Sequence, residues 1–419
     1  MTDKKRKEKL ILHYLDGLTK KKYTLKQAAE STGYTIEHIC RLKKKYELFG
    51  SEILIHGNTN RVPKNKTSQN TINKILVLYA TDDYKDLNFA TFRDALEDYE
   101  NIKVSYNTLR AIMLRAKIKS PEAHKIKKRD VVHRPRIRRQ QEGDLIQIDG
   151  TPYEWFKKSG DWNKYCMSGA IDDATGKLTA AYMTENECLY GIMELFRMTA
   201  KKHGLPREAY MDRAAWACVT PRQKNCLSLV EQLAGVHEKR TQIQRILDEL
   251  NIKQILAWSP QAKGRVERMW ETIQGRYPIW AKKHGITNCE QANARMQEFI
   301  DYFNKKWAVE PAKKQTAWSV VPEDINEILM AQFPHKTNVN GVFKFHSYQF
   351  AVTNCAFVAN KKFMLCVSQN GLSAKMPDGK YYPVELLDNI TYGAGETMPD
   401  VVRNIIYENL LSPAKEISA

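Results

Sequence analysis

Three acidic side chains occupy positions where an α/β fold places its functional groups. Asp149 follows the apolar run at 145–148, Asp212 follows the run at 209–211, and Glu267 lies in the segment directly after a third run at 253–258. Sites of α/β sheets form at strand ends, so these acids are the candidate chemical groups. If folding brings three carboxylates together, their repulsion should raise at least one pKa, and a bound cation would relieve it.

A purely structural role for these acids is the alternative. Asp149 and Asp212 would then only end strands, and Glu267 would pair with Lys263, four residues earlier on the same helix. Other nearby acids compete for the chemical role, namely Asp144, Asp172 and Asp173. Asp144 faces the opposite side of its strand because side chains alternate, and the other two fall in a turn.

The residues between these acids predict alternating strands and helices over residues 143–307. Three antiparallel strands come first, with a tight turn at 172–176 between the second and the third. In order, the predicted elements are Leu145–Asp149, Lys164–Ile171, Lys177–Met183, a helix at 187–202, the strand before Asp212, a helix at 241–250, Lys253–Trp258 and the helix of Glu267. This β-β-β-α-β-α-β-α order is that of RNase H-like folds, so we expect a multidomain α/β protein with an RNase H-like domain at 143–307.

The charge of the chain is concentrated near its start. The 419 residues carry a net charge of +18, and residues 1–142 hold 32 Lys and Arg against 17 Asp and Glu, which leaves +15 in that third. Such asymmetry indicates a polyanionic partner, although a solvated basic surface is the plainer alternative. The eight cysteines form no C-x-x-C pair, and no apolar run is long enough to span a membrane. We therefore expect a protein of the reducing cytoplasm.

Residues 1–57 have the pattern of a helix-turn-helix domain. A capping box at Thr24–Gln27 opens one helix, Gly33 ends it, and Thr35 opens a basic helix. The second helix of such a motif can lie in a DNA major groove, whereas an ordinary helical hairpin with a solvated basic face is the alternative. The candidate DNA contacts of this helix are Arg41, Lys43, Lys44 and Lys45.

Further basic segments follow this first domain. Residues 58–67 read as a basic linker, residues 68–120 as a second helix-turn-helix or winged-helix domain, and residues 121–142 as a second basic linker. Acids of the second domain, Asp94, Glu97 and Asp98, indicate that their helix does not lie on DNA. The candidate DNA contacts of the linkers are Arg61, Lys64, Lys127, Lys128, Arg136, Arg138 and Arg139.

The C-terminal third changes character again. Residues 288–307 predict one helix, 308–335 a connector, 336–392 a small β-barrel of short strands, and 393–419 a tail without a clear pattern. Turn signals at Asn370-Gly371 and Asp378-Gly379 separate the predicted strands. The barrel could bind DNA, join subunits or serve as a structural appendage.

Four motifs carry a resemblance to a known family. Gln147-Ile148-Asp149-Gly150, Tyr210-Met211-Asp212-Arg213, Thr241-Gln242 and above all Ser259–Arg268 resemble the DDE transposases of bacterial insertion sequences, of the ISNCY type, which are relatives of retroviral integrases. The resemblance covers roughly residues 20–390. The segment after Asp212 departs from the commoner integrase pattern, because an Asn-Gly turn is missing and residues 221–239 form an insertion before Glu267. Trp216 in this region reads as a core residue, with stacking on an unpaired base as the alternative.

The resemblance implies an integrase-type catalytic core and a metal site. Asp149, Asp212 and Glu267 would hold two Mg²⁺ or Mn²⁺ ions per active site, with Asp149 bridging both ions, Asp212 binding one and Glu267 the other. Two such ions, roughly 3.5–4 Å apart, can activate a nucleophile and stabilise the leaving oxygen of a phosphodiester. Lys263 and Arg265 would contact DNA near the scissile phosphate, or would be exposed charges only.

The family resemblance implies a transposase that binds the terminal inverted repeats of its element and cleaves and joins double-stranded DNA. A homodimer or higher multimer on paired ends is expected, with target DNA as a further partner. Two alternatives stay open. One is a non-catalytic DNA-binding regulator or domesticated transposase, and the other is an RNase H-like nuclease that cuts without joining.

Overall fold

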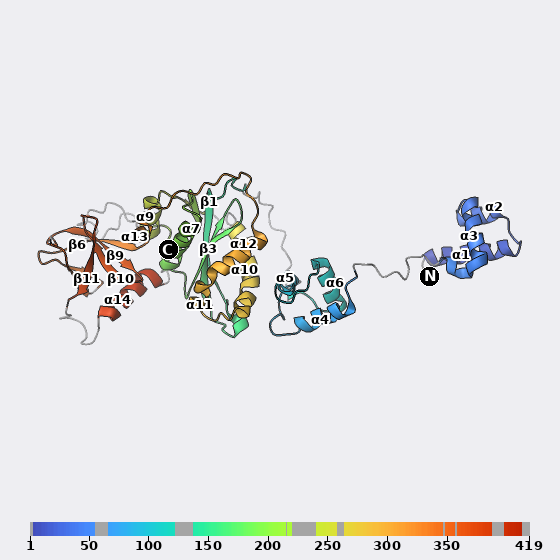
Figure 1. The fold of residues 1–419 in the computed structure, drawn as a ribbon, viewed down its shortest axis with the longest axis horizontal. Coiled ribbons are helices and arrows are strands. Elements are labelled where there is room, and N and C mark those ends of the chain that lie inside the picture. Colours follow the sequence, from blue (N-terminus) through green and yellow to red (C-terminus); the bar gives the residue numbers. More distant parts are fainter. Residues whose placement is uncertain are drawn as a thin grey trace. The chain divides into compact units, whose positions relative to one another are not determined.

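The computed structural model describes residues 3–54, 66–121, 137–214, 216–219, 240–257, 264–346, 348–356, 358–387 and 398–412 (Figure 1). The chain divides into two compact units, residues 1–75 and residues 76–419. The finer domain limits expected from the sequence remain predictions. In the part of the chain that is described, no helix is both long enough and apolar enough to cross a membrane.

The first unit contains a bundle of short helices. They are α1 (Asp3–Thr19), α2 (Leu25–Thr32), α3 (Ile36–Phe49) and a 3₁₀ turn at Gly50–Leu54. Thr24 and Gln27 form the predicted capping box, and Gly33 ends α2 with a φ of 72°. Leu15, Ala28 and Ile39 pack in the core between these helices. The helix, glycine turn and basic helix are therefore confirmed as local structure, whereas the helix-turn-helix assignment stays a prediction.

All the regular structure in residues 66–121 is helical, and these residues contain no strand. The helices are α4 (Gln69–Tyr79), α5 (Phe89–Tyr99) and α6 (Tyr106–Arg115). Asn88 and Ser105 cap α5 and α6 by accepting a backbone N–H with their side chains. Phe92 and Leu96 of α5 and Leu109 of α6 are fully buried. We call residues 76–121 the helical module.

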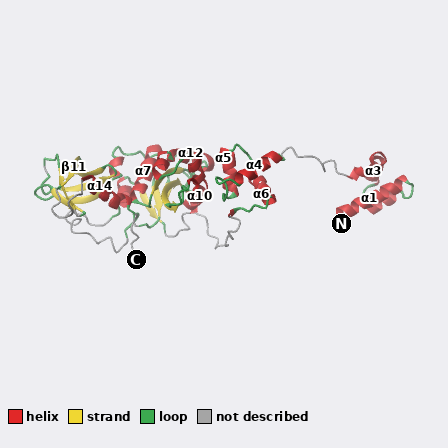
Figure 2. Cartoon of the chain, turned by 90° about the horizontal axis from the view of Figure 1, so that it is seen from below, coloured by secondary structure: helices red, strands yellow, loops and turns green. Residues whose placement is uncertain are grey.

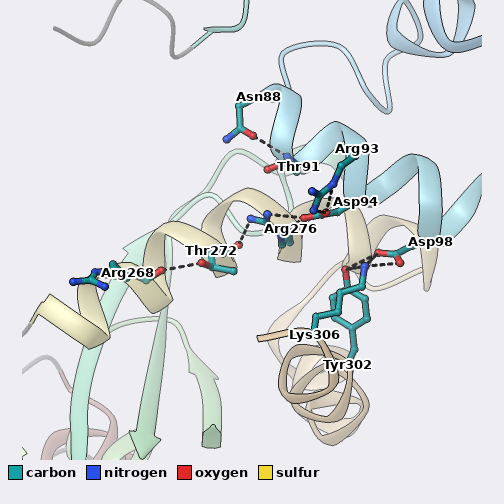
Figure 3. A network of polar contacts seen from close by, with 10 residues as sticks. All are labelled: Asn88, Thr91, Arg93, Asp94, Asp98, Arg268, Thr272, Arg276, Tyr302 and Lys306. Atoms are coloured by element: carbon teal, nitrogen blue, oxygen red, sulfur yellow. Dashed lines mark hydrogen bonds and ion pairs between the residues drawn. The ribbon is translucent and has the colours of Figure 1, made fainter. Parts of the chain in front are cut away.

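The acidic side of α5 faces the domain that follows it (Figure 3). Asp94 Oδ2 accepts hydrogen bonds from Arg276 at 2.9 and 2.6 Å, and the Asp98 carboxylate accepts one from Tyr302 at 2.7 Å. Lys306 forms an ion pair with Asp98 at 2.5 Å. The acids that set this helix apart in the sequence are thus engaged with basic and phenolic groups of the chain itself.

The central domain is built on a mixed five-stranded sheet. Its elements are β1 (Leu145–Tyr153), β2 (Tyr165–Asp172), β3 (Leu178–Thr184), α7 (Leu189–Lys202), β4 (Glu208–Met211), α9 (Gln242–Glu249), β5 (Lys253–Leu256) and α10 (Gly264–Lys283). The strand order is β3-β2-β1-β4-β5, antiparallel from β1 to β3 and parallel from β1 to β5. The predicted sequence of strands and helices is confirmed.

Two apolar layers cover this sheet (Figures 1 and 2). Ile146 and Ile148 pack with residues of α7 and α9 in one core. Met167 and Ile171 of β2 pack with residues of α10 and α12 in another. Neighbouring strand residues point to opposite faces, so β1 presents even-numbered residues to α7 and odd-numbered ones to α10.

The helix expected at 288–307 is two helices. These are α11 (Cys289–Ala294) and α12 (Met296–Trp307), and Arg295 separates them with φ −112° and ψ 8°. The side chain of Arg295 bonds the His284 carbonyl at 3.1 Å and pairs with Glu298. The prediction of one continuous helix was therefore wrong, because a new helix, α12, begins after Arg295.

The C-terminal strands form one antiparallel six-stranded sheet. They are β6 (Ala331–Lys336), β7 (Val342–Phe345), β8 (Tyr348–Val352), β9 (Lys362–Ser368), β10 (Gly371–Lys375) and β11 (Tyr381–Leu386), in the order β6-β9-β10-β11-β8-β7. Aromatic rings of β6 and β7 meet, since Phe333 lies 5.2 Å from Phe345. Closure into a barrel stays a prediction, because in the described residues no ladder joins β6 to β7.

Regular structure extends beyond the expected barrel on both sides. The connector expected at 308–335 already contains a short helix, α13 (Ile325–Ile328), and most of β6. Pro334 fits there because β6 is an edge strand, which can lack one ladder donor. The tail also contains structure, since α14 (Met398–Ile406) and the π-helical turn at 407–411 bury Val401, Ile405 and Leu410.

Candidate active site

The sheet register brings two of the three predicted acids onto adjacent strands. β1 continues past Asp149 to Tyr153, so Asp149 lies within the strand and does not end it as the sequence predicted, whereas Asp212 directly follows β4. β1 and β4 are parallel, and Gln147 lies opposite Tyr210. Continued by two residues, this register sets Asp149 opposite Asp212, on the same face because each follows its paired residue by two. Neighbouring strands are about 4.8 Å apart. Both side chains are partly buried.

Helix α10 runs along β1 on the face that carries Asp149. Trp270 donates its indole N–H to Asp149 Oδ2 at 3.0 Å, and Gln274 bonds Thr151 Oγ1 at 3.2 Å. Four helical residues advance about 6 Å, and two strand residues about 6.6 Å, so helix and strand keep pace. Gly169, paired with Asp149 on β2, leaves room for the indole, since a Cβ there would lie 2.9 Å from the ring.

Glu267 lies on α10 three residues before Trp270. It is exposed, and the helix geometry sets it about 4.5 Å along the axis from Trp270. Residues three apart share one side of a helix, so Glu267 projects from the side that holds Asp149. Across the described residues, no three His, Cys, Asp or Glu side chains lie close enough together to hold a metal ion. The fold thus brings β1, the end of β4 and α10 close together. It does not gather the three carboxylates at one point.

The residues after Asp212 fold back toward the sheet. The Asp212 side chain accepts the backbone N–H of Ala214 at 3.1 Å. Trp216 is 7% exposed and packs in the core beside α7, which confirms its interpretation as a core residue. Its indole N–H bonds Glu187 Oε1 at 3.2 Å. The insertion expected at 221–239 lies outside the described residues.

Glu187 is a carboxylate near this strand end that the sequence did not single out. A Cβ on Gly150 would lie 3.0 Å from Glu187 Oε1 and 3.3 Å from the Cys166 sulfur. Burial, and next to it the charge of Glu187, raises the pKa of the Cys166 thiol to about 12. Positions 149 and 150 face opposite sides of the sheet, and Asp149 faces α10. Glu187, which lies next to Gly150, is therefore on the α7 side. No local signal marks it, because it precedes α7 without a motif.

Two predicted DNA contacts form ion pairs within the chain. Arg265 Nε lies 2.7 Å from Asp173 Oδ1, a carboxylate that is fully buried. Arg139 pairs with Glu208 through one nitrogen and lies 3.9 Å from Asp144 through another. These pairs account for both side chains without DNA. Phosphate contacts by Arg139 and Arg265 stay predictions.

The other predicted contacts are one paired lysine, a set of exposed residues and a set outside the described residues. Lys43 lies 3.6 Å from Glu47 on α3. The exposed ones are Arg41, Lys44, Lys45 and Arg138. Those outside the described residues are Arg61, Lys64, Lys127, Lys128, Arg136 and Lys263. DNA contacts by all of these residues stay predictions.

The central domain therefore belongs to the class of α/β domains that carry acids on adjacent parallel strands. The chain is similar to transposases of insertion sequences, as its motifs predicted. It is 26% identical over 412 residues to the transposase for insertion sequence IS1202 of Streptococcus pneumoniae, covering 90% of this chain and 86% of that one. It is 28% identical over 309 residues to putative transposase y4bF of Sinorhizobium fredii, covering 73% of this chain.

The match to the Sinorhizobium relative spans 64% of that protein's length. The sequence matches no protein-family model. Among solved structures, a simian T-cell lymphotropic virus intasome chain is 12% identical with a TM-score of 0.31, and covers 76% of this chain and all of that one. The catalytic core domain of HTLV-2 integrase is 17% identical with a TM-score of 0.28, over 42% of this chain and 95% of that one. Both scores are low, so the structural reasoning rests on the strand register and contacts described above.

Proposed function

We propose that the chain is a DDE-type transposase with an RNase H-like catalytic domain, which cleaves and joins DNA at the ends of its insertion sequence. The observation that carries this proposal is the register that sets Asp149 beside Asp212, with α10 bound to Asp149 through Trp270. The similarity to transposases from two bacteria supports the same function.

Asp149, Asp212 and Glu267 would hold divalent cations, Mg²⁺ or Mn²⁺. The donor set fits because all three groups are carboxylates, and hard cations take oxygen ligands. When bound, two such ions supply a nucleophile at neutral pH and stabilise the leaving oxygen. The chain's own contribution is to position the ligands: the sheet sets the two aspartates, and the Trp270 indole holds one Asp149 oxygen. Glu267, exposed on the first turn of α10, would join them when the ions bind.

Double-stranded DNA would be bound by the basic N-terminal part of the chain. Exposed basic side chains of α3, among them Arg41 and Lys45, lie on the second helix of the predicted helix-turn-helix. They would read the terminal inverted repeats. Phosphate contacts release counterions, so the affinity should fall steeply as salt increases. A multimer on paired ends would bring two such domains and two active sites together.

The test uses the full chain and a labelled duplex that carries the ends of the element, with Mg²⁺ or Mn²⁺. We expect the wild type to nick and join this DNA. Asp149→Asn, Asp212→Asn and Glu267→Gln should bind the duplex with unchanged affinity and neither nick nor join it. Asp144→Asn is the matched control, since Asp144 pairs with Arg207 at the start of β1, and it should retain activity.

The outcomes separate the alternatives. Binding without any cleavage by the wild type would indicate a non-catalytic regulator. Cleavage without joined products would indicate a nuclease. Normal nicking by all three acid variants would show that the chemistry lies elsewhere in the chain.

A further inference from the structure

Asp173 is a fully buried carboxylate that connects three separate segments of the central domain. Its Oδ1 atom accepts the Gln147 side-chain amide at 2.8 Å and lies 2.7 Å from Arg265 Nε. Its Oδ2 atom accepts the backbone N–H of Arg139 at 2.8 Å. The three partners come from β1, from the first turn of α10, and from the described end of the segment that leads out of the helical module.

Each of the first two partners lies two residues before a proposed catalytic acid. Gln147 precedes Asp149 on the same strand face, and Arg265 precedes Glu267 on the first turn of α10. The first turn of a helix is where it frays, because its N–H groups lack partners within the helix. A side chain fixed to the sheet at this turn therefore limits the movement of Glu267.

We infer that Asp173 is a positioning residue of the active site, which acts through Arg265 to hold the first turn of α10 in place relative to β1. This inference rests on the proposed function, since it assigns a role toward Glu267. Asp173 itself touches no reacting atom. It sets the separation between the strand that carries Asp149 and the helix that carries Glu267.

Burial decides between this role and the phosphate contact expected for Arg265. The Asp173 side chain is 0% exposed and that of Arg265 is 21% exposed. A buried charge is very costly unless it is paired, so Arg265 would give up its pair with a fully buried carboxylate if it turned to a phosphate. The ion pair should persist when DNA binds.

The Arg139 contact extends the same arrangement to the entry of the domain. Arg139 bonds Asp173 by its backbone and Glu208 of β4 by its side chain. The segment that arrives from the helical module is thus fixed to the carboxylate that also holds α10. Asp173 therefore holds both this segment and the first turn of α10.

The experiment compares Asp173→Asn, Arg265→Gln and the double variant in the full chain. Single-turnover cleavage of prebound, labelled element ends gives the rate, and a binding titration gives the affinity. Misplacement of a catalytic group by about 1 Å can cost on the order of 100-fold, so each single variant should cut about 10- to 100-fold more slowly with unchanged affinity. The double variant should be no slower than the slower single one, because both changes remove one interaction. Arg265→Lys, which keeps the charge, should recover part of the rate.

A second readout does not depend on activity. Hydrogen exchange at the amides of 268–271, which bond the carbonyls of the first turn, should be faster in Asp173→Asn than in the wild type, whereas the amides of 276–283 should be unchanged. Asp144→Asn, which alters an acid at the same end of β1, is the control and should change neither. The neutral double variant should be more stable than Arg265→Gln alone, so a folding defect in the single variant does not prevent the comparison.

Two results would overturn the inference. One is unchanged exchange at the amides of 268–271 in Asp173→Asn. The other is a weakened affinity with a normal bound rate in Arg265→Gln, which would make Arg265 a phosphate contact. An inactive wild type with faster exchange in Asp173→Asn would instead reject the proposed function and leave the anchoring intact.

Discussion

Helix α10 carries two ion pairs of nearly equal geometry, one on its first turn and one in its second half. At its start, Arg265 lies 2.7 Å from Asp173, with side chains 21% and 0% exposed. Eleven residues later, Arg276 lies 2.6 Å from Asp94, with side chains 14% and 7% exposed. The first pair joins α10 to a turn of its own sheet, and the second joins it to α5 of the helical module.

The difference lies in what surrounds each pair. Around Asp173 the neighbours are buried strands and two apolar layers. Around Asp94 the contacts are mostly polar, with Lys306 on Asp98 (Figure 3) and with Lys282 and Lys283 on Asp83. Equal burial therefore does not mean equal function: the first pair orders one fold, whereas the second attaches a module that is held by charge.

The largest expected effect comes from removing Arg276. Arg276→Ala would leave the buried Asp94 carboxylate with Arg93 alone, and breaking a buried pair costs about 3–5 kcal/mol where no other partner remains. Since Arg93 also pairs with Asp94, we expect about 2–3 kcal/mol. Denaturant unfolding and hydrogen exchange of the α5 amides would measure the loss.

Arg93→Ala is the matched control, because Arg93 pairs with the same carboxylate but its side chain is 39% exposed. It should cost less than about 1 kcal/mol, as partly exposed pairs do. Equal losses for both variants would show that burial of Arg276 does not distinguish it. Faster exchange at the amides of α10 residues 268–271 in Arg276→Ala would show that the two ends of the helix are not independent.

A similar loss is expected in the C-terminal sheet, from a group that is buried without a charge partner. Burial, and next to it the charge of His346, lowers the pKa of His335 from its usual 6.5 to about 4. The folded state therefore favours neutral His335, and this stability is present above the unfolded pKa of about 6.5. It is lost as the pH falls through 6.5 toward 4, by about 3 kcal/mol in total.

The measurement is unfolding of the C-terminal sheet between pH 7 and pH 4, followed by hydrogen exchange of β6 and β9. His335→Phe removes the titrating group among the rings of Phe343, Phe345 and Phe363, and should flatten the pH dependence over this window. An unchanged slope in that variant would assign the acid sensitivity to other groups. The result separates acid loss in this sheet from loss at the ion pairs of α10.

Local signals in the sequence predicted the central domain well. Apolar runs ended by Asp149 and Asp212 gave β1 and β4, and the capping box at Thr241 gave the start of α9. These signals work because strand burial and helix capping depend on neighbours in sequence. The acids of α5 also carried information, since an acidic helix in a basic segment needs a basic partner.

Long-range contacts could not be predicted in the same way. Arg265 reads as an exposed base near a helix start, and only the fold shows the buried Asp173 opposite it. Because of Pro334 and His335, β6 was predicted to be part of a connector. An edge strand nevertheless tolerates a proline, and a neutral histidine can be buried. Glu187 gave no signal at all, because its neighbours Gly150 and Trp216 are brought to it by folding alone.

The next effect tests how closely α5 approaches α10. Gly275 has room for no side chain, since a Cβ there would lie 2.9 Å from Thr91 Oγ1. Overpacking of this kind costs about 1–3 kcal/mol, so Gly275→Ala should destabilise the attachment of the helical module by that amount. Thermal unfolding and hydrogen exchange of α5 would measure it.

The double variant Gly275→Ala, Thr91→Ala supplies the control, because it removes the atom that the new methyl group would meet. It should regain most of the lost stability. If it regains none, the cost of Gly275→Ala arises within α10 and not at the contact with α5. A loss confined to α5 would confirm that the polar end of α10 responds separately from the end at Asp173.

The smallest effect is expected at the edge of the same interface. Asp83 accepts hydrogen bonds from Lys282 and Lys283, which lower its pKa below the usual value, and the three side chains are 28–34% exposed. Either Lys282→Ala or Lys283→Ala leaves the other partner in place, so each should cost about 0.2–1 kcal/mol. The stabilisation is present above the unfolded pKa of Asp83 and is lost as pH falls through its lower folded pKa. It should also shrink as salt increases, because partly exposed charges are screened, whereas the buried Asp94–Arg276 pair should change little. Unfolding of both variants at low and high salt would measure this, and a salt response as large in Arg276→Ala as in the wild type would assign the screening to these outer lysines.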